Sequence, residues 1–131
     1  MENVGCVTYT EHVLFRGQNF GEAEKIRLIN VVLHELCHQW FGNLSTMKWW
    51  NDLWLKEAFA TFVSFLCMDY VGDYQTTLPN RWVNFNGYKN RGFTEDDLKT
   101  THPVLKNASN TDSVVNMFNG ITYGKGCSFL K

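Results

Sequence analysis

Hydrophobic residues recur at spacings of three and four over two long stretches of the chain, a pattern typical of helices with one buried face. In the first stretch, residues 22–42, they are Ile26, Ile29, Leu33, Leu36, Trp40 and Phe41. In the second, residues 53–71, they are Leu55, Ala58, Phe59, Phe62, Phe65, Leu66 and Tyr70. Gly42 ends the first stretch and Gly72 follows the second, and glycine suits the left-handed position that often ends a helix. The pattern predicts two helices with these boundaries.

The remaining segments predict one strand, two further helices and a loop. Residues 6–15 read CVTYTEHVLF, rich in β-branched and aromatic side chains, and predict a strand. A third helix is expected over residues 74–88, and the polar residues 89–112 are expected to form a loop. A last helix is expected to begin near Tyr123 and to continue to the final residue. This order predicts an α+β fold, with a short β region followed by a mainly helical lobe.

Length and charge narrow the class of protein. The chain has 131 residues, which is enough for one domain, and both ends interrupt an expected element, so residues 1–131 are expected to be one partial domain. Its 12 basic and 13 acidic side chains give a formal charge of -1, which gives no reason to expect a nucleic acid partner. No apolar run approaches the roughly 20 residues of a membrane-spanning helix. The first residues also lack the basic start of a secretory signal.

The cysteines indicate a reducing environment. Cys6, Cys37, Cys67 and Cys127 are widely spaced and form no CxxC pair. Two of them fall within apolar helical patterns, where cysteine usually behaves as a small buried hydrophobe. We expect free thiols rather than a disulfide framework, and on that basis a cytoplasmic location.

One motif carries recognisable chemistry: His34-Glu35-Leu36-Cys37-His38, an H-E-x-x-H on a predicted helix. Four residues advance a helix by slightly more than one turn, so His34 and His38 share a face and their imidazoles can bind one ion. Glu35 lies about 100° round the helix from His34, beside the ion rather than on it. That position is suited to a general base that activates water at a zinc ion.

Two histidines do not complete a catalytic zinc site, which usually has three protein ligands and an open position for water. Glu57 is the candidate third ligand: it follows His38 with 18 residues between, on the next predicted helix. It stands among apolar residues, where an unpaired carboxylate would be costly to bury. We therefore expect His34, His38 and Glu57 to bind one Zn²⁺. Asn30, Asp52 and Thr61 are candidates for orienting the histidines.

The segment HELCHQWFGNLSTMKWWNDLWLKEAFATF resembles the zinc-binding region of the M1 family of aminopeptidases, gluzincins with the pattern HExxH-x18-E. Thermolysin-type endopeptidases have one more residue in that gap. Met1-Glu2-Asn3 resembles the end of the family's GAMEN motif, and ITYGKGCSFL resembles its tyrosine region. The resemblance therefore runs along nearly the whole chain and implies a thermolysin-like catalytic domain.

The resemblance also implies roles for individual residues. His34, His38 and Glu57 would bind zinc and Glu35 would be the general base. Glu2 would bind the free α-amine of a peptide substrate, Met1 would lie by the first substrate side chain, and Tyr123 would donate to the oxyanion. The family's full enzymes add an N-terminal β-domain and a helical C-terminal domain, so the remainder of a longer enzyme is an expected partner.

The chain departs from the family pattern in two places. Val4 stands where the family often has an aromatic residue, which bears on substrate preference, and Ala58 stands where it often has glycine. The main hypothesis is a zinc aminopeptidase that hydrolyses the N-terminal peptide bond. Two alternatives are a zinc endopeptidase of the same fold and an inactive zinc-binding fragment that serves as a structural or interaction module.

Overall fold

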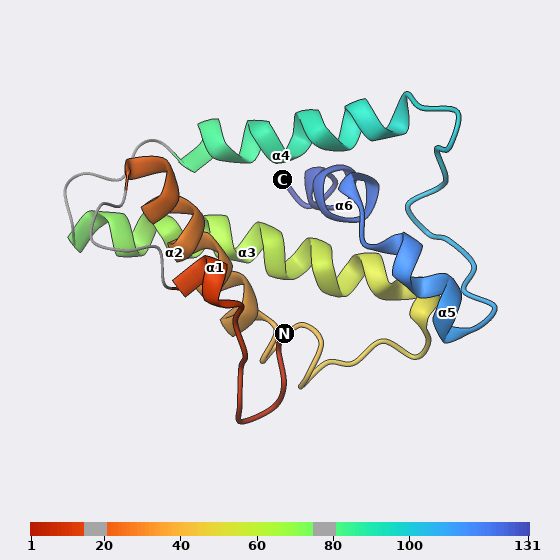
Figure 1. Cartoon of the computed structure of the whole chain (residues 1–131), viewed down its shortest axis with the longest axis horizontal. Helices are drawn as coiled ribbons and strands as arrows, with labels where there is room; N and C mark the ends of the chain where they lie inside the picture. The colour runs from red at the N-terminus through yellow and green to blue at the C-terminus, as the bar shows by residue number, and fades with distance from the viewer. Residues whose placement is uncertain (15–20, 75–80) are drawn as a thin grey trace.

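The computed structural model describes residues 1–14, 21–74 and 81–131, and for residues 71–74 and 81 it describes the backbone alone. Within these residues the chain is mainly helical (Figure 1). The helical elements, in chain order, are α1 (Glu11–Leu14), α2 (Glu22–Cys37), the 3₁₀ turn η1 (Trp50–Asp52), α3 (Leu53–Tyr74), α4 (Arg81–Asp96), α5 (Thr111–Val114), the 3₁₀ turn η2 (Val115–Met117), the π-helix η3 (Ile121–Lys125) and α6 (Gly126–Ser128).

The long helix α3 lies in the middle of the molecule (Figure 1). It packs against α2, α4, η3 and α6, and it is apolar around most of its circumference, as expected for a helix covered on several sides. The main core is formed where these helices meet, with the rings of Phe65 and Phe85 edge to face at 5.4 Å between centroids. A second, smaller core surrounds the start of α3, where the fully buried Leu53 packs with Ala108 and Met117.

The prediction of a strand over residues 6–15 is wrong for residues 6–14, the part of this segment that the structure describes. Residues 1–8 instead fold back as a closed loop, in which the backbone N–H of Thr8 donates to the carbonyl of Met1 and the amine of Met1 donates to the carbonyl of Thr8, both at 3.0 Å. Gly5 makes the reversal with a φ of 76°, and α1 follows at Glu11. Phe15 lies outside the described residues. A strand needs an edge to pair with, and the described residues form only an isolated bridge between Phe41 and Ser45.

The two long helices are confirmed with shifted ends. The first begins at Glu22 as predicted but ends at Cys37, and a series of turns then leads to Gly42, whose φ of 134° is one that favours glycine. The second runs from Leu53 to Tyr74, so Gly72 does not end it. The α+β expectation therefore holds in its helical part, and the β part is absent from the described residues.

The third helix and the loop after it differ more from the prediction. Tyr74 belongs to α3, residues 75–80 lie outside the described part, and α4 continues to Asp96 instead of ending near residue 88. The expected loop therefore begins only after α4. The expected last helix is present, beginning at Ile121 as a π-helix, but α6 ends at Ser128, so the expectation that it continues to the final residue is wrong.

Two glycines set the distance between α4 and η3. A Cβ atom on Gly124 would lie 2.1 Å from the carbonyl oxygen of Tyr88, and one on Gly92 would lie 2.4 Å from the backbone nitrogen of Lys125. The backbones of α4 and η3 therefore touch, which explains why the helix continues through the polar residues 89–96. η3, which carries Tyr123, also packs against α3.

We expect Gly124→Ala to destabilise the fold by about 1–3 kcal/mol or more, because a methyl group there must push two backbones apart. The control is Gly87→Ala on α4, where an added Cβ meets nothing within 4 Å. That change should stabilise by roughly 0.5–1 kcal/mol through helix propensity. Urea unfolding followed by circular dichroism measures both, and equal effects of the two changes would contradict the close contact.

Candidate metal site

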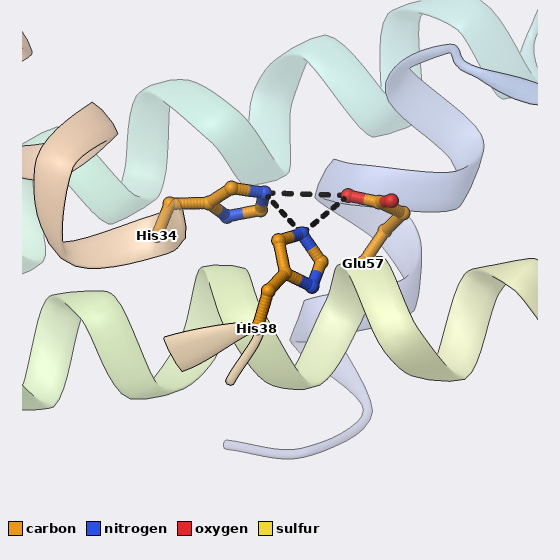
Figure 2. Close-up of side chains that lie close together, drawn as sticks. All are labelled: His34, His38 and Glu57. Carbon is orange, nitrogen blue, oxygen red and sulfur yellow. Dashed lines mark hydrogen bonds and ion pairs between the residues drawn. The ribbon is translucent and has the colours of Figure 1, made fainter. Parts of the chain in front are cut away.

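The two histidines of the H-E-x-x-H motif converge at the C-terminal end of α2. The Nε2 atoms of His34 and His38 are 3.0 Å apart, and their rings meet nearly at right angles. His38 is only 1% exposed. The helical spacing of four residues brings the rings together, as predicted, and the ring nitrogens point toward the same place (Figure 2).

Glu57 reaches this place from α3. Its Oε2 atom lies 3.3 Å from the Nε2 atoms of both His34 and His38, and the residue is 3% exposed (Figure 2). The three candidate ligand atoms all lie within 4.8 Å of one another. Two imidazole nitrogens and one carboxylate oxygen are a ligand set that zinc takes in hydrolytic sites, with a fourth position left for water.

The outer hydrogen bonds of the histidines agree with metal binding. Nδ1 of His38 lies 2.8 Å from the carbonyl oxygen of Phe41, which can only accept, so Nδ1 carries a proton and the neutral ring keeps its lone pair on Nε2. Nδ1 of His34 lies 3.4 Å from the hydroxyl of Thr61, one of the three suggested orienting residues. Another, Asn30, donates instead to the sulfur of Met68 at 3.6 Å. The residues therefore fit a zinc ion.

The electrostatics of Glu57 show why a cation suits this place. Burial alone would raise the pKa of Glu57, but its hydrogen bonds with His34 and His38 and their charges outweigh burial, so the net pKa lies well below the usual range. For His38, burial alone would lower the pKa, but the hydrogen bond to Glu57 and its charge raise it above the usual value. A buried carboxylate that stays ionised needs a nearby positive charge.

Glu35 and Tyr123 lie next to the three candidate ligands. Glu35 is not a member of the group of His34, His38 and Glu57, but it forms a second group of potential metal ligands with Glu2 and His38, whose ligand atoms also lie within 4.8 Å of one another. The ring of Tyr123, carried by η3, is 6.0 Å from the ring of His34. Burial is the largest cause of a raised pKa at Tyr123, and the negative charge of Glu57 and a hydrogen bond to it raise the pKa further. The hydroxyl of Tyr123 therefore keeps its proton at neutral pH.

The two N-terminal candidates also lie at this site. The carboxylate of Glu2 is paired with the ammonium group of Lys56, and the backbone carbonyl of Glu2 accepts a hydrogen bond from Nδ2 of Asn43 at 2.7 Å. Burial by itself raises the pKa of Glu2, but the hydrogen bond from Lys56 and the positive charge of Lys56 together with the other lowering interactions outweigh burial, so the net pKa is below the usual value. The amine of Met1 is 3.0 Å from Oε2 of Glu35, and Met1 is largely exposed.

Two neighbours of the site were not predicted. Lys56 contacts both Glu2 and Glu57, the latter at 3.4 Å, and Asn43 fixes the backbone at Glu2. Nothing in the sequence distinguishes Lys56 from a solvated helical lysine, except that it directly precedes a carboxylate expected to be buried. Asn43 follows Gly42 in the turns after α2, and its partner is 41 residues away in sequence.

Comparison with known proteins shows which family the chain belongs to. The model of the peptidase family M1 domain matches residues 1–131, and the chain belongs to this family. It is 42% identical to an aminopeptidase N of Streptomyces lividans, 41% identical to a leucyl aminopeptidase of Saccharolobus solfataricus and 39% identical to a glutamyl aminopeptidase of Bitis rhinoceros. Each match covers 100% of this chain but only 15%, 16% and 14% of the respective relative. The chain thus spans about 15% of the length of these relatives. Among the described helices, none is both long and apolar enough to cross a bilayer.

We expect the purified chain to bind one zinc ion. Mutation of a residue that hydrogen-bonds a metal ligand typically weakens metal binding by ~10–100-fold, and Glu57→Gln, which changes a ligand itself, should weaken zinc binding by more than that. Thr61→Val is the matched comparison: it removes a hydroxyl next to His34 but no ligand, so its effect should fall within that range. Competition with a chromogenic chelator measures both affinities. Equal zinc affinity in the parent chain and Glu57→Gln would exclude Glu57 as a ligand.

Proposed function

We propose that this chain carries the catalytic zinc site of an aminopeptidase, which hydrolyses the N-terminal peptide bond of peptides. The observation that supports this most strongly is the convergence of the candidate ligands with Glu2, Glu35 and Tyr123 at one place, although these residues come from four separate segments of the chain. In this proposal His34, His38 and Glu57 hold zinc. The bound ion supplies Lewis acidity, which polarises a carbonyl group and makes water more acidic.

Each remaining residue has a role that follows from its chemistry. Glu35 accepts a proton from the attacking water and transfers it to the leaving amine. The hydroxyl of Tyr123, whose raised pKa keeps it protonated, donates a hydrogen bond to the carbonyl oxygen as negative charge develops there. The carboxylate of Glu2 pairs with the α-ammonium group of the substrate. An internal peptide bond offers no such group, so Glu2 favours cleavage at the N-terminus.

Peptides with a free N-terminus are therefore the proposed substrates, and the remainder of a longer enzyme is a proposed partner because the relatives extend far beyond this segment. The cytoplasmic location inferred from the cysteines stays a prediction. The endopeptidase alternative differs at one point, since it does not require Glu2 to bind an amine. The non-catalytic alternative requires zinc binding without hydrolysis.

A fluorogenic aminoacyl amide, assayed with and without a chelator, tests the proposal. We expect hydrolysis that the chelator abolishes, and Glu35→Gln should lower kcat by about 10²–10⁴ while the zinc content is unchanged. The exposed Asp97→Asn is the charge-matched control and should leave kcat unchanged. Full activity of Glu35→Gln would refute the base assignment. Cleavage of an N-acetylated peptide would favour the endopeptidase, and bound zinc without hydrolysis would favour the non-catalytic module.

We expect Tyr123→Phe to lower kcat by about 10²–10³ with little change in KM, because the donor acts on charge that develops only in the transition state. The two side chains differ by one hydroxyl, so packing of η3 against α3 should be retained. Steady-state kinetics with the same aminoacyl amide measure the effect. A change in KM alone would show that Tyr123 binds the substrate without stabilising the oxyanion.

A further inference from the structure

Lys56 places a positive charge between the two functional carboxylates Glu2 and Glu57. Its Nζ atom pairs with Oε1 of Glu2 and lies 3.4 Å from Oε1 of Glu57. Oε2 of Glu57, the other oxygen, faces the two histidines. Lys56 therefore lies on the side of the Glu57 carboxylate that faces away from the candidate metal position, and toward the carboxylate proposed to bind the substrate amine.

The lysine is held in this position by packing as well as by charge. Its side chain is only 12% exposed. A Cβ atom on Gly42 would lie 2.9 Å from Cδ and 3.0 Å from Cγ of Lys56, so the methylene stem passes directly over the glycine backbone. Gly42 also needs its φ of 134°, which other residues rarely adopt. The ammonium group is consequently a fixed charge of the site.

Lys56 is not the only anchor of Glu2. The backbone of Glu2 is fixed separately by Nδ2 of Asn43, and the N-terminal loop is closed by its own backbone hydrogen bonds between Met1 and Thr8. Removal of the lysine charge should therefore leave Glu2 near its place. The main consequence is that the carboxylate loses a cationic partner that is already bound to it.

We propose that Lys56 is a specificity-determining residue that competes with the α-ammonium group of the substrate for Glu2. This inference rests on the proposed function, in which Glu2 binds that amine. Two ammonium groups at one partly buried carboxylate repel each other, so Lys56 weakens the binding of every ligand with a free amine. The released amino acid carries the same group, and weaker binding of it limits inhibition by product. Glu2 then still favours substrates with a free α-amine over those without one, but it binds that amine only weakly.

The test compares two ligands on the zinc-loaded chain: leucine hydroxamate and its deamino counterpart, 4-methylpentanohydroxamic acid. Both present the same hydroxamate to a metal, and they differ only in the amine. Calorimetric Kd values are measured for the parent chain, Lys56→Met, Lys56→Arg and the exposed control Lys99→Met. Lys56→Met keeps an unbranched stem over Gly42 and removes the charge; Lys56→Gln replaces it should the first variant not fold.

The proposal predicts that Lys56→Met binds leucine hydroxamate about tenfold more tightly, since a repulsive charge has been removed. The affinity for the deamino compound should change less than about twofold, because that compound has no charge for Lys56 to repel. Lys56→Arg and Lys99→Met should resemble the parent. Weaker or unchanged binding of leucine hydroxamate, or an equal change for both ligands, would overturn the proposal and leave Lys56 a structural counter-ion.

A Glu2→Gln variant separates this result from a failure of the proposed function. If Glu2 binds the amine, Glu2→Gln should remove most of the preference for leucine hydroxamate over its deamino counterpart. An unchanged preference in Glu2→Gln refutes the amine-binding role itself, and the inference about Lys56 with it. A lost preference in Glu2→Gln together with no effect of Lys56→Met refutes the inference alone.

Discussion

The burial of Glu57 on the largely apolar helix α3 is the constraint on which the site depends. A carboxylate that is 3% exposed stays ionised only beside positive charge or strong donors, and here these come from the ring nitrogens of His34 and His38 and from Lys56. The histidines can reach it because α2 packs along α3. The packing of the two longest apolar patterns in the chain therefore brings together the groups that fit a zinc ion.

Electrostatic balance extends from the candidate ligands to the rest of the site. His38 belongs both to the group with Glu57 and to the group with Glu2 and Glu35, and Lys56 contacts the carboxylates of Glu2 and Glu57. The backbones of α4 and η3 also meet closely at Gly92 and Gly124, and Gly124 directly follows Tyr123 in η3. The catalytic proposal thus depends on this glycine contact as well as on the residues of the motif.

Local spacing explains which features could be predicted from the sequence. The i, i+4 pair of histidines and the apolar spacing that predicts α2 and α3 are properties of single helices, and the structure has both helices and the converging rings. Leu36 and Trp40 of the first pattern are nevertheless exposed. The strand at residues 6–15 could not be judged in this way, because a strand forms only with a partner, and the described residues provide none. The extension of α4 to Asp96 was missed because the polar residues 89–96 gain their helical partner through Gly92 and η3, far away in sequence. Lys56 was not predicted for the same reason, because its proposed role comes from contact with Glu2, which is 54 positions away in sequence.

X-ray absorption at the zinc edge of the metal-loaded chain identifies the metal ligands. We expect a first shell of nitrogen and oxygen atoms at about 2.0–2.2 Å, with the multiple-scattering pattern of two imidazoles and no sulfur. The chain has four cysteines, two of them buried, and Cys37 stands directly before His38, so sulfur ligation is a real alternative. Sulfur at about 2.3 Å, or a shell with fewer than two imidazoles, would contradict the site of His34, His38 and Glu57.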